Sequence, residues 1–180
     1  MNEKLTKTLQ EKLNIKNKFA VPQPVKVVIN VGIGKMRGNE KFRKTVEESL
    51  EIITGQKPKV TKARKAIAGF KVRENEEVGL VVTLRGKRMN YFLEKLANIV
   101  LPRVRDFRGL NPKGFDKNGN YTLAVTEQIV FAEISHEKAE MPHGMSITIV
   151  TTAPDTNQGK ILLESLGFPF KKETKVGENK

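Results

Sequence analysis

A dense run of cations without a single acid, residues 57–73 (KPKVTKARKAIAGFKVR), is the part of this chain best suited to chemistry with a partner. A surface that is merely solvated usually mixes charges of both signs, because like charges repel. An unbalanced cluster needs a polyanion to neutralise it, and nucleic acid is the commonest polyanion in a cell. The cations of this run, which we call the basic cluster, are Lys57, Lys59, Lys62, Arg64, Lys65, Lys71 and Arg73.

The composition of the whole chain agrees with a nucleic-acid partner. Its 180 residues hold 33 Lys and Arg against 20 Asp and Glu, a net charge of +13. A solvated basic surface is the simpler alternative, but the clustering of the cations favours nucleic acid. Aromatic residues make up only 6% and there is no Trp, so a stacking platform for single strands is not expected. Recognition of a folded RNA by its shape and backbone fits better.

Two other patterns have the residue types for chemistry, and each has a simpler interpretation. The glycine-rich segment 32–38 (GIGKMRG) follows a predicted strand, but it lacks the glycine spacing of the dinucleotide and phosphate-binding loops. We interpret it as a strand-to-helix turn. His136 and His143 are the only histidines, and without cysteine they are too few for a zinc site. We expect both in surface loops, and we predict no catalytic residue, no metal and no cofactor.

Composition also limits the class of protein. There is no Cys, which excludes disulfides, and no apolar run approaches the roughly 20 residues that a membrane span needs. The first residues show no apolar signal region, so we expect a cytoplasmic protein with no membrane partner. The length suits one domain, predicted over residues 1–170, with a polar and disordered tail over 171–180.

Hydrophobic periodicity predicts the elements that must carry the cations. Apolar residues alternate with others over residues 25–33 and 78–85, which indicates two strands with one apolar face each. Helical spacing of apolar residues predicts helices, and weaker signals predict further strands. The predicted helices are 2–14, 40–54, 88–101 (ended by Pro102) and 157–166, and the further strands are 58–63, 121–131 and 145–152. The mixed order predicts a single α+β domain, mainly an antiparallel sheet with helices on one face and an open face.

That architecture assigns three side chains to the open face. If the apolar strand sides pack on helices, Asn30, Thr83 and Arg85 point away from them. Asn and Thr hydrogen-bond sugar hydroxyls and phosphates, and Arg binds a phosphate with two hydrogen bonds. The open face is therefore a candidate surface for RNA.

Several long motifs resemble one family in the right order. The segments ITGQKPKVTKARKAIAGFKVR, TLRGKRM, PRVRDFRGL, FDKNGNY and the ending FPF are similar to the bacterial large-subunit ribosomal protein five family, over about residues 20–170. The resemblance implies an α+β sheet protein that binds 5S rRNA in the central protuberance, beside 23S rRNA and other proteins of that region. It implies 5S rRNA contacts by Asn30, Gln56 and Thr83. The basic residues implied to support them are Lys57, Lys62, Arg64 and Arg85.

The resemblance implies two further contacts. The segment Ile67–Arg73 would approach the P-site tRNA, through Ala68, Gly69, Phe70, Lys71 and Arg73. The excursion over about residues 105–145 would lie near small-subunit ribosomal protein thirteen and contribute an intersubunit bridge. Two alternatives remain open at the level of sequence: a DNA-compacting protein without sequence preference, and an enzyme that uses the glycine-rich turn on a phosphorylated substrate.

Overall fold

The protein is built on an antiparallel sheet. The computed structural model describes residues 3–36, 38–134 and 141–171. Within them the strands lie in the order β2-β3-β1-β5-β4, and every neighbouring pair is antiparallel. Their bounds are β1 Pro24–Gly32, β2 Lys59–Lys62, β3 Glu77–Leu84, β4 Tyr121–Val125 and β5 Met145–Thr151. The predicted α+β fold with a mainly antiparallel sheet is confirmed.

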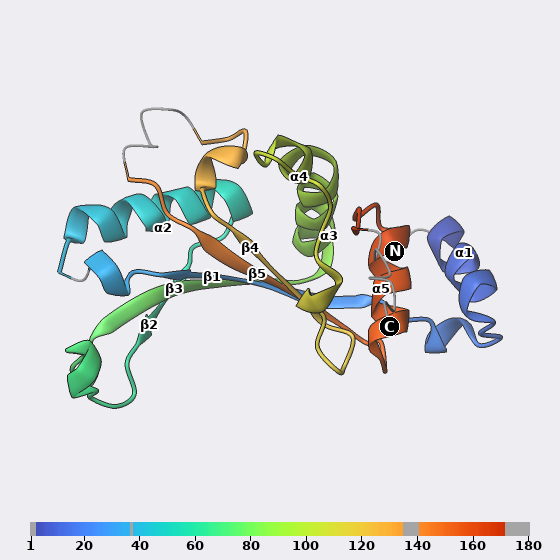
Figure 1. Ribbon diagram of the computed structural model, residues 1–180, viewed down its shortest axis with the longest axis horizontal. Coiled ribbons are helices and arrows are strands. Elements are labelled where there is room, and N and C mark those ends of the chain that lie inside the picture. Colours follow the sequence, from blue (N-terminus) through green and yellow to red (C-terminus); the bar gives the residue numbers. More distant parts are fainter. Residues whose placement is uncertain (1–2, 37, 135–140, 172–180) are drawn as a thin grey trace, which may run out of the picture.

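The two faces of the sheet differ in polarity because side chains alternate along each strand. On β1 the side chains of Val27, Ile29 and Val31 are fully buried, and those of β3 and β5 in register with them are buried too. Two helices cover this face, α2 (Glu40–Thr54) and α3 (Gly86–Lys95), as Figure 1 shows. Each large apolar side chain buried here stabilises the fold by about 1.5–3 kcal/mol.

Helix α2 begins and ends where local chemistry directs. The side chain of Asn39 accepts a hydrogen bond from the Phe42 amide at 3.1 Å, which satisfies one of the unpaired donors of the first turn. Gly55 follows the last residue with a φ of 65°, a left-handed conformation that favours glycine. The predicted helix over 40–54 is confirmed.

A second, smaller core lies at one end of the sheet. Helix α1 (Glu3–Leu13) packs beside α5 (Thr156–Ser165), and both lie at the end of the molecule away from the β2–β3 connection (Figure 1). Leu9, Val21 and Leu162 are buried between them. Asp155 caps α5 by accepting a hydrogen bond from the Gln158 amide at 2.7 Å. The chain that leaves α1 is thus fixed to the helix that ends the domain.

Two predicted boundaries were wrong. The helix expected to end before Pro102 continues through a π-helical segment (Leu96–Val100) into a short α4 (Leu101–Arg103). The Leu101 amide bonds the Leu96 carbonyl oxygen, and Pro102 then occupies the first turn of α4, where an amide donor is not needed.

The strand expected over 121–131 ends at Val125. At Gln128 the chain has left the sheet. The Gln128 side chain is buried, and it accepts a hydrogen bond from the His143 amide at 2.8 Å and donates one to the Met141 carbonyl oxygen at 3.2 Å. The predicted disordered tail lies outside the described residues apart from Lys171.

Candidate nucleic-acid interface

The face of the sheet opposite α2 and α3 is polar, and no helix of the described residues packs against it (Figure 1). It takes the alternate side chains of all five strands, because residues paired across an antiparallel ladder share a face. We call it the open face. Its members, from one edge to the other, are Lys59 and Thr61, then Gly79, Val81 and Thr83, then Lys26, Val28, Asn30 and Gly32, then Ser146, Thr148 and Val150, then Thr122 and Ala124.

Gln56 and Thr83 are brought together by a direct hydrogen bond. The Gln56 side chain donates from Nε2 to the Thr83 backbone oxygen at 3.4 Å. The turn that carries Gln56 is held by Thr54, whose hydroxyl donates to the Leu50 carbonyl at 2.6 Å and accepts from the Gln56 amide at 3.2 Å. Two local contacts and one between distant segments therefore fix a residue of the α2–β2 turn against the end of β3.

Asn30 lies on the neighbouring strand and on the same face. It pairs in register with Val81 on β3 and with Ser146 on β5, and its side chain is exposed. Thr83 is the diagonal neighbour of Asn30, at the roughly 7–8 Å that such positions have. Asn30 and Thr83 are thus neighbours on the open face, and Gln56, from a third segment of the chain, is bonded to the Thr83 backbone. We call these three residues the polar group.

A shallow hollow lies beside Asn30, centred on Gly79. A Cβ atom at Gly79 would meet the Val31 carbonyl oxygen at 2.9 Å and the Thr61 hydroxyl at 3.0 Å. Asn30, Thr61, Gly79, Ala124 and Ser146 are among the small or polar residues that line this hollow. Among the described residues, the open face therefore has no large projecting side chain at this place. Such a surface suits the backbone and sugars of a helical RNA rather than a single flipped base.

The basic residues lie around this polar group at different places. Lys62, Arg64 and Arg85 are exposed, and Arg85 immediately precedes α3. Lys57 is also exposed, but its ammonium lies 3.7 Å from the Glu47 carboxylate of α2, which partly offsets its charge. Lys59, on β2, shares the open face with Thr83 through its pairing with Val81. The edge of the sheet formed by β2 is thus its cationic edge.

The segment that follows β2 projects beyond the sheet, at the end of the molecule opposite α1 (Figure 1). Ile67 and Val72 pair through two backbone hydrogen bonds, which close a narrow loop. Ala68, Gly69 and Phe70 form one turn of 3-10 helix at its tip, and Lys71 follows with a left-handed φ of 51°. The Phe70 ring is 72% exposed and Arg73 is exposed as well, so the loop presents an aromatic ring among cations.

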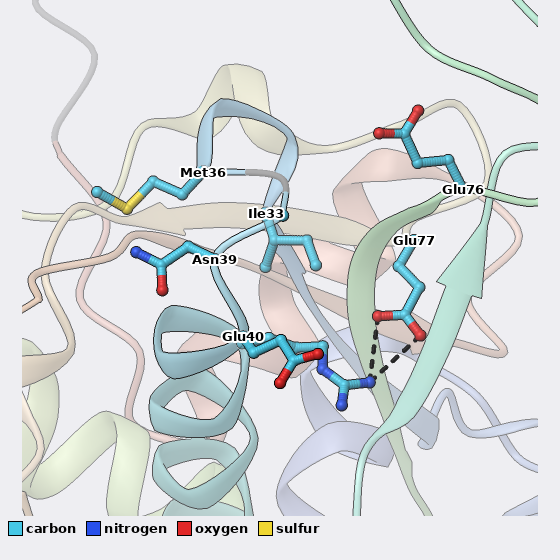
Figure 2. Close-up of a pocket in the computed structure, with 8 residues that line it drawn as sticks. Ile33, Met36, Asn39, Glu40, Glu76 and Glu77 are labelled. Atoms are coloured by element: carbon cyan, nitrogen blue, oxygen red, sulfur yellow. Dashed lines mark hydrogen bonds and ion pairs between the residues drawn. The ribbon is translucent and has the colours of Figure 1, made fainter.

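The glycine-rich turn after β1 has the wrong surroundings for a phosphate. Figure 2 shows a hollow lined by Ile33, Met36, Asn39, Glu40, Arg43, Glu76 and Glu77 among others. Both carboxylate oxygens of Glu77 accept from the Arg43 guanidinium, at 3.2 and 3.1 Å, so that cation is already engaged (Figure 2). A pocket with three glutamates repels an anion, even beside the first turn of α2. The interpretation as a strand-to-helix turn therefore fits the local charges.

His143 is buried, against the prediction of a surface loop residue. Its ring packs edge-on against Phe42, with centroids 6.2 Å apart, and its Nδ1 lies 3.3 Å from the Met141 carbonyl oxygen. Burial lowers the pKa of His143 below its ordinary value, although the hydrogen bond to Met141 acts in the other direction. His136 lies outside the described residues. No group of three or more His, Asp or Glu side chains in the described segments is placed to hold a metal.

Sequence reasoning missed part of the open face. Lys59 was seen only as one cation of the basic cluster, and Thr61, Ser146, Thr148 and Thr122 were not assigned to a surface. The alternation in residues 145–151 (MSITIVT) was a usable signal for Ser146 and Thr148. The hydrogen bond between the hydroxyls of Thr122 and Thr148, 3.0 Å apart, depends on strand register, which a single strand pattern does not contain.

Fold, charge and site together define a basic α+β protein with an uncovered polar sheet face. The ribosomal protein L5 family matches residues 17–73, and the C-terminal part of the ribosomal L5P family matches residues 77–170. This chain belongs to the ribosomal L5 family. It is a structural, non-enzymatic protein of the large ribosomal subunit. Both the family and the non-enzymatic role agree with the predictions made from the sequence.

Individual relatives agree over nearly the whole chain. A protein of Synechococcus sp. (strain RCC307), named large ribosomal subunit protein uL5, is 51% identical over 169 residues, which are 94% of each chain. The protein of the same name from Dichelobacter nodosus (strain VCS1703A) is 49% identical over 169 residues, with the same coverage. Large ribosomal subunit protein uL5c of Gracilaria tenuistipitata var. liui is also 49% identical, again over 94% of both chains. Bacterial proteins of this family are cytoplasmic, in agreement with the expected location.

Proposed function

We propose that this chain binds 5S rRNA through the open face of its sheet and helps to form the central protuberance, in contact with 23S rRNA and neighbouring ribosomal proteins. Asn30, Gln56 and Thr83 fix the register of the RNA by hydrogen bonds to its sugars and phosphates. Lys57, Lys62, Arg64 and Arg85 neutralise phosphates around them.

One observation carries this proposal. The hydrogen bond from Gln56 to Thr83 fixes a turn residue against an exposed strand residue, one position diagonal to Asn30. Preorganised polar groups lose little conformational freedom when they bind, so more of their interaction free energy appears as affinity. The cationic β2 edge beside them supplies the attraction that brings an RNA to this face.

The two remaining contacts are proposals that rest on the resemblance and on surface chemistry. The loop closed by Ile67 and Val72 approaches the P-site tRNA with Phe70 at its tip and Lys71 and Arg73 beside it, because an exposed ring among cations suits a nucleic acid. The excursion over about residues 105–145 forms the intersubunit bridge to small-subunit ribosomal protein thirteen. Residues 135–140 of this excursion lie outside the described residues.

The test is binding of the purified protein to 5S rRNA at physiological salt, in the presence of excess tRNA and then of excess duplex DNA. Binding that survives both competitors supports a specific ribosomal contact. Binding that tRNA and duplex DNA remove equally well contradicts a specific contact. It favours a basic protein without RNA specificity, including the DNA-compacting alternative. A chain that instead bound a small phosphorylated compound through Gly34 would support the enzyme alternative, which the glutamates of Figure 2 disfavour.

A further inference from the structure

Phe19 is the most exposed large hydrophobic side chain of the described residues, with 90% of its surface accessible. It lies in the connection between α1 and β1, which is at the opposite end of the molecule from the β2–β3 connection (Figure 1). Its neighbours Ile15 and Val21 both pack into the small core with Leu9. Apolar side chains of this segment can therefore reach that core, but Phe19 does not. Burial of such a ring would stabilise the fold, and the chain leaves that stabilisation unused.

The backbone that carries Phe19 is held rigidly. Asn14 ends α1 in a left-handed conformation, with a φ of 52°. The Gln10 side chain then donates from Nε2 to the carbonyl oxygen of Lys16 at 3.3 Å, which folds the chain back on the helix. Asn17 caps one turn of 3-10 helix (Lys18–Ala20) and accepts a hydrogen bond directly from the Phe19 amide at 2.9 Å. The ring is therefore presented on a structured turn rather than on a loose connection.

The charged residues of the segment that carries Phe19 have one sign. Residues 12–26 (KLNIKNKFAVPQPVK) contain four lysines and no acid, although the chain as a whole has 20 acids. Lys12 in the last turn of α1, Lys16 and Lys18 are all exposed, and Lys18 belongs to the same 3-10 turn as the ring. A protein partner with an apolar pocket would explain the ring but not the lysines, whereas a single-stranded stretch of RNA uses both, since every base has a face that stacks and every nucleotide a phosphate.

We propose that Phe19, with Lys16 and Lys18, forms a second RNA-binding site, distinct from the open face, in which the ring stacks on an unpaired base and the lysines hold the flanking phosphates. The inference rests on the proposed function, because it takes the partner to be RNA. It differs in the kind of RNA that is bound. The open face lacks aromatic side chains and suits a helical RNA, whereas a lone exposed ring needs a base that is free of its pair.

The chain contains no Trp, so one substitution supplies a reporter for the test. Phe19→Trp places the only tryptophan of the protein in this site, and stacking on a base quenches its fluorescence. The matched control is Ile52→Trp, because Ile52 is 39% exposed on α2 but lies one helical turn from Glu48 and next to Glu51. The probes are a hairpin RNA with an unpaired adenosine tail and the same hairpin with a blunt end.

We expect the tailed hairpin to quench Phe19→Trp strongly, the blunt hairpin to quench it weakly, and neither to affect Ile52→Trp. Phe19→Ala and Phe19→Leu should both weaken binding of the tailed hairpin by roughly five- to hundredfold, the range for loss of one base–aromatic stack. Full affinity in Phe19→Leu would overturn the stacking contact. Because Phe19 is exposed, circular dichroism of each variant should match that of the parent protein.

The outcomes separate this inference from the proposed function. If the parent protein binds 5S rRNA specifically but no RNA quenches Phe19→Trp, the open-face proposal stands and the second site is overturned. The second site is also overturned if a ribosomal-protein fraction, and not RNA, shifts the Phe19→Trp emission. If the tailed hairpin quenches Phe19→Trp while 5S rRNA binding is lost to competitors, the second site stands and the open-face proposal fails.

Discussion

Gln56 and Thr83 are joined across the fold by a hydrogen bond from the Gln56 side chain to the Thr83 backbone oxygen, at 3.4 Å and across 27 positions of sequence. Strand β2 stops pairing with β3 at Val81, so this oxygen lies beyond the end of the β2 ladder. The Gln56 amide supplies a donor there. A side chain proposed to meet RNA thus also completes the edge of the sheet.

Loss of the polar group should weaken binding of 5S rRNA without unfolding the protein. We expect Asn30→Ala, Gln56→Ala and Thr83→Val each to raise the Kd for 5S rRNA by about five- to hundredfold, since a polar partner left unpaired at an interface costs about 1–3 kcal/mol. Fluorescence anisotropy with labelled 5S rRNA measures the Kd. Thr45→Val, at a half-buried position of α2, is the control and should bind normally. Parent-like affinity in a variant that carries all three substitutions would refute the assignment of these residues to the RNA-binding site.

Gly79→Ala should destabilise the sheet at the hollow of the open face. The added Cβ would lie 2.9 Å from the Val31 carbonyl oxygen, a backbone atom that cannot move without disturbing the β1–β3 ladder. We expect a loss of about 1–3 kcal/mol in the free energy of unfolding, measured by urea denaturation. Gly32→Ala is the matched control, because nothing lies within 4 Å of its added Cβ. Equal losses in the two variants would show that the close approach of the Val31 carbonyl oxygen is not what destabilises Gly79→Ala.

The stability of the protein should fall on mild acidification because of His143. Burial lowers the pKa of its ring in the folded state, whereas the unfolded chain has the ordinary value of about 6.5. The unfolded state therefore binds more protons below that value, so stability is full above pH 6.5 and falls as the pH drops toward the folded-state pKa. The slope reaches at most about 1.4 kcal/mol per pH unit for one group.

Thermal unfolding of the parent protein and of His143→Phe measures this effect between about pH 7.5 and about pH 5.5, roughly one unit on either side of the ordinary pKa of histidine. The variant keeps a ring beside Phe42 but does not titrate, so its unfolding temperature should vary less with pH. His136→Gln controls for the other histidine of the chain and should behave like the parent. An unchanged pH dependence in His143→Phe would mean that another group is responsible.

The basic residues should differ in how they affect the salt dependence of RNA binding. Lys62→Gln and Arg64→Gln should each lower the slope of log K against log salt by roughly one, since each neutralised phosphate releases counterions. Lys57→Gln should change the slope less, because its ammonium already lies 3.7 Å from Glu47. Thr83→Val should weaken binding with an unchanged slope. A titration series in potassium chloride distinguishes these cases, and identical slopes throughout would argue against phosphate contacts at Lys62 and Arg64.

Much of the fold could be predicted because its signals are local. The alternation around Asn30 and Thr83 predicted both strands and the side of the sheet on which these residues lie. The Asn39 to Gly55 helix is likewise encoded in its own caps and apolar spacing. What could not be predicted depends on contacts between distant segments. Gln128 leaves the expected strand to bond the backbone of His143, and the same contact takes His143 out of the surface. Neither residue shows in its own neighbourhood that it will be buried.

The helix expected to end before Pro102 shows a different limit. Proline predicts an end because it lacks an amide donor, and this is correct for a regular α-helix. The π-helical segment before it changes which amides need acceptors, and the chain continues to Arg103. In the site, the resemblance supplied Gln56, but only the structure shows its bond to Thr83.

The strand order has a consequence for the time at which the protein becomes functional. Asn30 lies between Val81 of β3 and Ser146 of β5, so the centre of the open face needs a strand from nearly the end of the chain. Contacts between residues so distant in sequence form slowly, because a large loop must close first. During synthesis, β1, β2 and β3 emerge long before β5. A nascent chain therefore exposes the cations of the basic cluster before the open face is complete. If the open face binds RNA as proposed, discrimination among RNAs arises only when translation of the chain is almost complete.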